Sequence, residues 1–247
     1  MSSMSPPVLS RRRAPVWALT GIGCALLVLA VMAVNTGAMS LSLRTLLGRP
    51  FDDSLWQVWL TIRLPRVLLA MVVGCALASS GAVMQGLFRN PLADPGLLGI
   101  SSGAALAVAL TIVMPLALPP LLALYSHMIS AFAGSLAISV IVFTLSRFGH
   151  GGLSRLLLAG IAINALCGAA VGVLTYVSDD QQLRQFSLWS MGSLGQAQWP
   201  TLAVASSLIL PACIASFFMA RRLNILQLGE EDAHYLGVNV RRTQLQL

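Results

Sequence analysis

The sequence predicts an all-α, polytopic membrane protein with about six transmembrane helices, and three observations lead to this. Hydrophobic residues make up 57% of the 247 residues, and charged residues make up only 9%. A soluble domain carries about 25% charged residues, so this chain has too few charges to cover a water-facing surface. The charges are also confined to short segments, separated by uncharged stretches of membrane-spanning length. Lipid is therefore the expected solvent for much of the chain.

The uncharged stretches have room for six spans. Crossing the hydrocarbon core takes roughly 20 apolar residues. Pro119 and Pro120 divide the longest stretch into two spans, because proline ends a helix. The expected spans are residues 15–39, 65–88, 97–118, 121–145, 153–177 and 200–220.

The first span also fits a signal peptide, because three arginines at 11–13 precede it and small residues occur at 36–38. Its apolar run is long for a signal peptide, whose apolar core is about 7–15 residues, and five more spans follow. We therefore expect an uncleaved first span.

The second span begins at Arg63-Leu-Pro-Arg66 and is followed by a proline- and glycine-rich segment at 89–96. Pro65 suits the first position of a helix, where its missing N–H is not needed. Arginine pairs bidentately with carboxylates, so Arg63 and Arg66 suit an acidic docking partner. Alternatively, they anchor the helix start at the membrane interface. In segment 89–96 the residues before proline avoid the helical region, which predicts a stiff turn.

Small and polar residues recur inside the spans. Glycines share a helix face at positions 74 and 81, 99 and 103, and 168 and 172. Small residues let helices approach closely in lipid, so these pairs predict tight packing. Polar residues such as Asn164 either face a water-filled path or form interhelical hydrogen bonds. The four cysteines lie inside apolar spans without metal-ligand spacing, which favours packing over disulfides.

The distribution of arginine predicts a cytoplasmic N-terminus. With the N-terminus inside, ten arginines fall on inner segments and five on outer ones. This agrees with the positive-inside rule. Arg63 and Arg66 depart from the rule locally, which suggests that they have a role of their own.

The sequence contains no catalytic residues and predicts no metal site. It lacks the G-x-x-x-x-G-K-[ST] phosphate-binding motif, so neither an ATP-hydrolysing site nor a bound cofactor is expected on this chain. His127, His150 and His234 have no metal-ligand spacing. His127 is expected near the outer end of the fourth span, as either a contact for a bound metal complex or an ordinary polar interface residue. The arginines do not cluster on one polar segment, which argues against nucleic-acid binding.

Five motifs occur in order between about residues 56 and 240. They are Arg63-Leu-Pro-Arg66, Gly81-Ala-Val-Met-Gln85, Asn90-Pro-Leu-Ala-Asp-Pro-Gly-Leu-Leu-Gly99, Ser154-Arg-Leu-Leu-Leu-Ala-Gly160 and Trp189-Ser-Met-Gly-Ser-Leu194. These motifs resemble the permease subunits of iron-complex and vitamin B12 ABC importers. The resemblance implies a ten-helix, multi-pass subunit of the bacterial inner membrane that forms a homodimer, with the translocation path at the dimer axis. It also implies two ABC ATPase subunits on the cytoplasmic side and a periplasmic binding protein on the other.

The resemblance further implies roles for particular residues. Arg63 and Arg66 match arginines that meet glutamates of the binding protein. Asn90 and Leu92 match residues of the inner gate.

The second gate element and the coupling region follow from the same resemblance. Gly152 and Leu153 stand where the vitamin B12 permease has small hydroxyl residues, so their gate chemistry differs. Segment 223–240 matches the coupling helices that press into the ATPase, and an amphipathic helix docking in a groove is a common mode of recognition. The contact candidates there are Leu228, Gly229, Glu230, Leu236 and Gly237.

We therefore expect a permease subunit, not an enzyme, that moves an iron complex by alternating access. Residues 1–247 form a single, incomplete permease domain, with 221–240 as its cytoplasmic coupling region. Haem is the first expected substrate, a ferric siderophore the second, and vitamin B12 the alternative. A piece that ends before the seventh span is expected not to transport alone.

Two other classes of membrane protein remain as alternatives. An ion-coupled secondary transporter needs an ionisable residue inside a span, and only His127 qualifies. A non-transporting membrane scaffold is the other.

Overall fold

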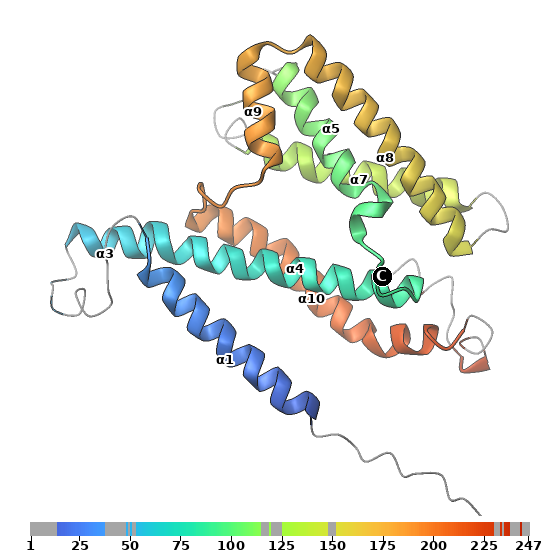
Figure 1. The fold of residues 1–247 in the computed structure, drawn as a ribbon, viewed down its shortest axis with the longest axis horizontal. Coiled ribbons are helices and arrows are strands. Elements are labelled where there is room, and N and C mark those ends of the chain that lie inside the picture. Colours follow the sequence, from blue (N-terminus) through green and yellow to red (C-terminus); the bar gives the residue numbers. More distant parts are fainter. Residues whose placement is uncertain are drawn as a thin grey trace, which may run out of the picture. The chain divides into compact units, whose positions relative to one another are not determined.

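The computed structural model describes residues 14–37, 48, 50, 53–114, 119, 125–147, 152–229, 233, 235–237 and 243 (Figure 1). Over these residues the regular structure is entirely helical, which confirms the predicted all-α fold class. The elements are α1 (Ala14–Asn35), α3 (Ser54–Val58), the π-helix η1 (Trp59–Arg63), α4 (Leu64–Phe88), the 3-10 helix η2 (Pro95–Leu98), α5 (Ile100–Val113), α7 (Ser126–Arg147), α8 (Gly152–Val177), α9 (Asp180–Ser190) and α10 (Trp199–Leu226).

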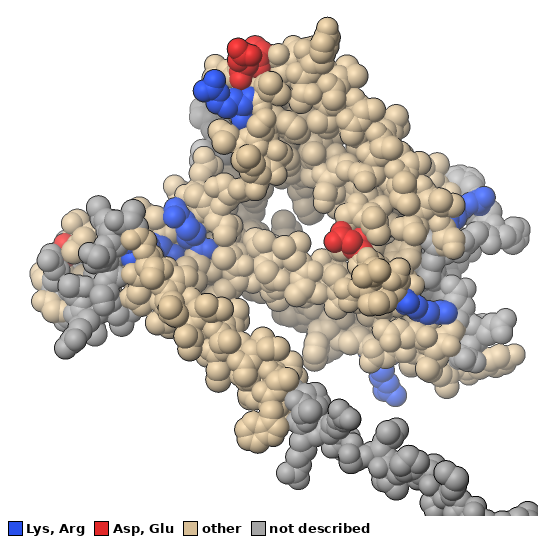
Figure 2. Space-filling view, in the orientation of Figure 1, with Lys and Arg blue, Asp and Glu red and all other residues tan. Residues whose placement is uncertain are grey.

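Five helical stretches in the described part of the chain are long and apolar enough to cross a membrane. They are Val16–Asn35, Ser54–Phe88, Ser126–Ser146, Ser154–Val177 and Trp199–Leu226. Each coincides with a predicted span, namely the first, second, fourth, fifth and sixth. Figure 2 shows the described charges as isolated blue and red groups on a predominantly uncharged surface. Exposed apolar helices of this kind match lipid as the solvent.

The third predicted span is shorter than expected. Its helix, α5, has 14 residues, which gives about 21 Å at 1.5 Å per residue against a hydrocarbon core of about 30 Å. The predicted span begins at Leu97, but the chain there forms η2 and then turns at Gly99, whose φ of 77° is in the left-handed region. Glycine adopts this conformation without a steric penalty. The turn separates η2 from α5 and shortens the span.

The second predicted span is longer than expected, because the helix starts at Ser54 and not at Pro65. Asp53 caps its start by accepting a hydrogen bond from the Leu55 N–H at 3.2 Å. Pro65 therefore lies inside a continuous helical run, which contradicts its predicted place at the first helical position. The run tolerates it because the preceding residues form η1, in which the Leu64 N–H donates to Trp59 O.

The chain divides into two compact units. The first consists of residues 1–71 and 195–205, and the second of residues 72–194 and 206–247. The first unit contains α1, α3, η1 and the beginnings of α4 and α10. In it most residues of α1 are exposed, and Val34, near the C-terminal end of the helix, is buried.

The second unit is centred on α5. This helix packs against both α7 and α8, α9 lies against it, and η2 packs on α8 (Figure 1). Its residues Val108, Ala109 and Ile112 are buried. A Cβ at Gly103 would lie 2.8 Å from the Gly134 backbone oxygen of α7, so these two helices cross in direct backbone contact. The predicted tight packing at Gly103 is confirmed.

Candidate functional site

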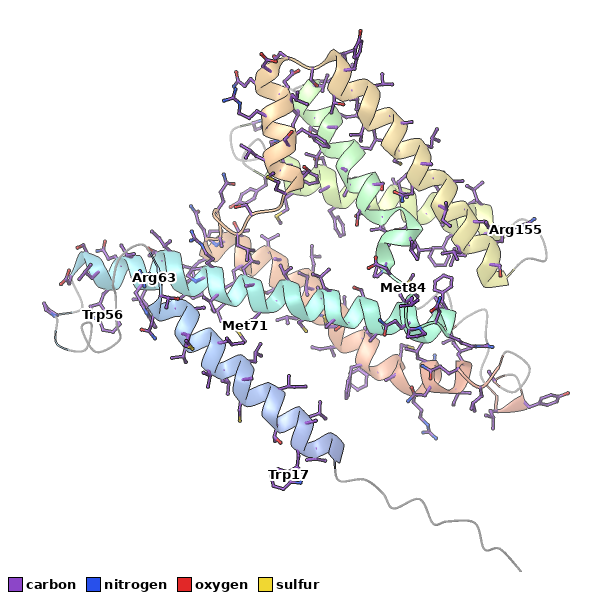
Figure 3. All side chains as sticks on the ribbon, in the orientation of Figure 1. Trp17, Trp56, Arg63, Met71, Met84 and Arg155 are labelled. Atoms are coloured by element: carbon purple, nitrogen blue, oxygen red, sulfur yellow. The ribbon has the colours of Figure 1, made fainter. Side chains whose placement is uncertain are left out.

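The first candidate site is the start of α4, where the sequence predicts a docking pair of arginines. Arg63 is half-buried, and its Nη1 donates to the backbone oxygens of Val34 at 3.1 Å and Asn35 at 3.3 Å. These oxygens belong to the last turn of α1, where carbonyls lack partners within the helix. A cation is also favoured there by the helix dipole. Arg63 therefore caps α1, at the junction with α4 seen in Figure 3.

Arg66 makes a different contact. Its side chain is exposed, and its Nη2 donates to the Gly195 backbone oxygen at 3.1 Å. This bond joins the start of α4 to the segment that leads into α10. The docking role of both arginines stays a prediction, but their surroundings differ: Arg63 is engaged with α1, whereas Arg66 presents an exposed cation.

Trp199 supplies a hydrogen bond that Pro65 cannot make. In η1 the Leu64 N–H donates to the Trp59 oxygen, five residues earlier, so in the same pattern the donor to the Leu60 oxygen would be the N–H of residue 65. That residue is proline and has no N–H. The Trp199 Nε1 takes the place of this missing donor, with a hydrogen bond of 3.0 Å to Leu60 O. This bond joins the start of α10 to η1 within the first unit.

The second candidate site is the loop after α4, which carries the predicted gate residues Asn90 and Leu92. Asn90 Oδ1 accepts from the Leu92 N–H at 2.9 Å, and Asp94 Oδ1 accepts from the Gly96 N–H at 2.6 Å. Such side-chain turns hold a loop in one conformation without regular structure. The stiff turn predicted from the proline pattern is therefore present. The Leu92 side chain is 84% exposed and free to contact another surface.

The same loop is attached to a hydrophobic core. Ala93 and Leu98 are buried in a cluster with Met84 of α4, Val142 of α7 and Leu156 of α8. Figure 3 labels Met84 beside the loop. The loop that carries Leu92 is thus anchored on three helices of the second unit.

The other predicted gate residues, Gly152 and Leu153, are the first residues of α8, and their side chains lie outside the described residues. The helix itself is fixed against the loop. A Cβ at Gly160 would lie 2.6 Å from Leu97 O and 2.8 Å from Leu98 Cα, so η2 rests directly on α8. The structure therefore places the two gate segments on one packed body, and their gating role stays a prediction.

The third candidate site is the segment after α10, where the sequence predicts contact with an ATPase. Leu228 and Leu236 are 64% and 60% exposed. Gly229 and Gly237 have φ angles of 141° and 79°, which glycine adopts readily and other residues avoid. Glu230 lies outside the described residues. Each leucine is exposed and precedes a glycine with positive φ, and contact of either leucine with a partner stays a prediction.

His127 belongs to a polar cluster at one end of the second unit. Its Nε2 lies 3.3 Å from the Gln185 amide nitrogen of α9, and its Nδ1 lies 3.5 Å from Ser126 Oγ. Gln182 also holds α9 by donating to Ile112 O at 3.3 Å. The cluster ties α9 to α5 and α7. This favours the interpretation of His127 as a structural polar residue over that of a substrate contact.

The polar and sulfur groups within the spans have specific partners. Asn164 of α8 bonds to Ser102 of α5, which supports the interhelical interpretation of this residue. Cys75 of α4 and Cys213 of α10 are free thiols whose sulfurs lie 3.8 Å apart. Among the described residues no group of three or more His, Cys, Asp or Glu could hold a metal.

Two close contacts were not foreseen from the sequence. One is Gly160 against η2, and the other is Gly86 of α4 against Leu223 of α10. The glycine pairs singled out for packing at 74 and 81 and at 168 and 172 have open space around them. A single glycine gives no periodic signal, so only the partner's position reveals which glycine is needed for close approach.

Comparisons with known proteins agree on one family. A sequence model of the FecCD transport family matches residues 23–247. The hemin transport system permease protein HmuU of Yersinia pestis is 76% identical over 222 residues, covering 90% of this chain and 66% of that protein. The cobalamin import system permease protein BtuC of Halobacterium salinarum is 40% identical over 185 residues, covering 74% of this chain and 48% of that protein.

A solved structure gives the same result for the fold. It is described as an inward-facing conformation of a metal-chelate type ABC transporter, and it matches with a TM-score of 0.78 at 32% identity. The match covers 93% of this chain and 70% of that one. The chain spans about half to two thirds of the length of the curated relatives named above.

Proposed function

The chain belongs to the FecCD transport family, and on that premise we propose that it is permease sequence of a binding-protein-dependent ABC importer for haem. One observation carries the choice of substrate. The chain is 76% identical to a hemin permease and about 40% identical to cobalamin permeases. Haem is an iron complex, in keeping with the iron-complex importers that the sequence motifs resemble.

The proposed importer has three kinds of subunit. This chain supplies spans of the permease in the bacterial inner membrane, a second copy completes the dimer, and the path lies between them. Separate ATPase subunits hydrolyse ATP, and a periplasmic protein delivers haem. The N-terminus lies in the cytoplasm. The arginine distribution supports this orientation through the positive-inside rule.

Docking of the binding protein takes place at the start of α4. Arg66 supplies the exposed cation that pairs with a carboxylate of the binding protein, because an exposed guanidinium can form two parallel charge-assisted bonds. Arg63 supports this end by capping α1. Complementary charge of this kind mainly raises the association rate.

Transport proceeds by alternating access between two packed arrangements. The loop at Asn90 and the start of α8 at Gly152 form the inner gate. The exposed Leu92 supplies an apolar gate surface. On the same side, Leu228 and Leu236, with the turns at Gly229 and Gly237, press into the ATPase, and Glu230 lies between them in the sequence.

Reconstitution tests this proposal. The full-length permease would be co-purified with its ATPase and binding protein and placed in liposomes. ATPase activity and uptake would then be measured with haem-loaded, ferric-siderophore-loaded or vitamin B12-loaded binding protein. We expect haem alone to stimulate both. Stimulation by another cargo would reassign the substrate, and uptake driven by an ion gradient without ATP would refute an ABC importer.

The first alternative substrate is vitamin B12, which is favoured by the matches to cobalamin and vitamin B12 permeases. The same experiment separates the two, because haem and vitamin B12 are offered on matched loaded proteins. A ferric siderophore is the other iron complex that the experiment includes.

A further inference from the structure

A leucine of α10 is seated against a glycine of α4 near one end of both helices. A Cβ built on Gly86 would lie 2.8 Å from both Cγ and Cδ2 of Leu223, and 3.1 Å from its Cδ1. Carbon atoms in contact normally lie about 3.5–4.0 Å apart, so a Cβ at position 86 would force this leucine to shift from its observed place. Gly86 and Leu223 are both buried, with Leu223 8% exposed. We call this contact the Gly86–Leu223 joint.

On one side the joint is connected to the proposed ATPase surface. Leu223 lies in the last turn of α10, and its backbone oxygen accepts from the Gln227 N–H at 3.2 Å. The next hydrogen bonds, from Leu228 to Ile225 and from Gly229 to Leu226, continue the turn without a break. The exposed Leu228 therefore lies within five residues of Leu223 along a hydrogen-bonded backbone.

On the other side the joint is connected to the proposed gate loop. Gly86 lies four residues before Asn90, and the Asn90 N–H donates to Gln85 O at 3.2 Å. Two residues before Gly86, Met84 enters the core that also buries Ala93 and Leu98 of the loop. This hydrogen bond and this core therefore connect α4 at Gly86 to the loop that carries Leu92.

From these connections we infer that the Gly86–Leu223 joint transmits motion of the ATPase-coupling segment at Leu228 to the gate loop at Asn90. This inference rests on the proposed function, because it needs an ATPase that moves the coupling segment. Packed interfaces have discrete arrangements and do not deform continuously. A shift of Leu223, which packs directly against the Gly86 backbone, therefore moves α4 as well. In this proposal Gly86 and Leu223 touch neither the cargo nor ATP. They are positioning residues, which act through the coupling segment and the gate loop.

Gly86→Ala tests the joint, with Gly81→Ala as its matched control. Both glycines lie in α4, but a Cβ at Gly81 meets nothing within 4 Å. Alanine favours a helix over glycine, so steric contact with Leu223 is what distinguishes the two variants. The complete importer in liposomes would be assayed for ATP hydrolysis and haem uptake. We expect Gly86→Ala to keep hydrolysing ATP while its uptake per ATP falls at least about fivefold, the lower end of typical allosteric couplings. Gly81→Ala should match the wild type.

The second arm removes the leucine. Leu223→Ala alone removes the side chain that contacts Gly86 and should also uncouple haem uptake from ATP hydrolysis. In Gly86→Ala with Leu223→Ala, each new methyl group occupies part of the space that the leucine vacates. We expect this double variant to recover more uptake per ATP than either single variant. If it recovers nothing, or if Gly86→Ala behaves like Gly81→Ala, the joint is refuted.

A third arm reads the gate directly, without depending on the cargo. Leu92→Cys in a background free of the native cysteines would be labelled with a maleimide, with and without ATP. We expect ATP to change the labelling rate in the parent protein and in Gly81→Ala, and to have less effect in Gly86→Ala. Equal ATP dependence in all three would overturn the joint. An ATP response without haem uptake in the parent protein would instead show that the proposed cargo is wrong.

Discussion

Arg63 and Arg66 share a short motif but make different contacts. Arg63 satisfies carbonyl oxygens at the end of α1, whereas Arg66 is exposed and bonds to Gly195. The sequence predicts a cationic pair at the start of a span, because the charges and Pro65 are visible in it. It does not predict capping by Arg63, since that depends on where α1 ends in space.

These contacts predict different defects for the two alanine variants. Arg63→Ala removes two hydrogen bonds of a charged donor to α1, and such bonds contribute about 1.5–3 kcal/mol each. We expect a lower melting temperature of the purified permease. Arg66→Ala should leave the melting temperature near that of the wild type and slow association with the binding protein, most clearly at low salt.

Thermal unfolding in detergent and stopped-flow association would measure both variants. Arg63→Lys and Arg66→Lys serve as controls, because lysine keeps the charge and loses the planar guanidinium. Equal stability of Arg63→Ala and the wild type would contradict the capping role. An unchanged association rate in Arg66→Ala would remove this residue from the docking surface.

At the scale of helices, charge spacing predicted the number and approximate position of the apolar elements. The details that it did not predict arise from backbone hydrogen bonding. Pro65 is accommodated inside a helix because η1 changes the hydrogen-bond register before it, and Gly99 divides η2 from α5 by its left-handed φ. A hydrophobicity pattern reports which residues avoid water. The pattern does not show which carbonyl oxygen lacks a backbone N–H donor, as the Leu60 oxygen does before Pro65.

The neighbouring thiols in α4 and α10 give a test of how these helices pack. Cys75 and Cys213 have sulfurs 3.8 Å apart, against about 2.05 Å in a disulfide, so the two free thiols are close neighbours. We expect copper phenanthroline with dissolved oxygen to oxidise the two thiols to one disulfide within the chain. Peptide mapping would identify the bridge, and Cys75→Ser should abolish it. If oxidation produces no Cys75–Cys213 bridge, the observed proximity of α4 and α10 is contradicted.

The segment after α10 gives a test at the same scale. Leu228 and Leu236 are exposed, and burying a leucine against a partner contributes about 1.5–3 kcal/mol. Leu228→Glu or Leu236→Glu should therefore weaken ATPase binding by about tenfold or more. Titration of the labelled ATPase would measure this, with Leu228→Met and Leu236→Met as apolar controls. Undiminished binding of both glutamate variants would place the ATPase contact elsewhere.

At the scale of the whole molecule, the order of motifs identified the family from the sequence, and the comparisons confirmed it. The gate and coupling residues could be assigned only by resemblance. The sequence alone does not mark them, because asparagine, glycine and leucine are common residue types in any turn or helix end, as at Asn90, Gly152 and Leu228. The contacts that could link them, at Gly160 and at Gly86, join positions 63 and 137 residues apart in the chain. No local pattern records such a pairing.

Membrane orientation is the remaining whole-molecule prediction. The continuous helical run Ser54–Phe88 separates Arg66 from Asn90, so these residues should lie on opposite sides of the membrane. Arg89, Arg155, Arg221 and Arg222 adjoin the ends of spans on the Asn90 side, which the positive-inside rule assigns to the cytoplasm. Met191, four residues before the Arg66 partner Gly195, should then lie outside.

Single cysteines would test this orientation in a background without native cysteines. Leu92 and Met191 are 84% and 82% exposed, so a cysteine at either position should react readily. We expect a membrane-impermeant maleimide to label Met191→Cys in right-side-out vesicles and Leu92→Cys in inverted vesicles. The reverse pattern would place the N-terminus outside, against the arginine distribution. Labelling of both from one side would place Leu92 and Met191 on the same face of the membrane, which contradicts the three predicted spans between them.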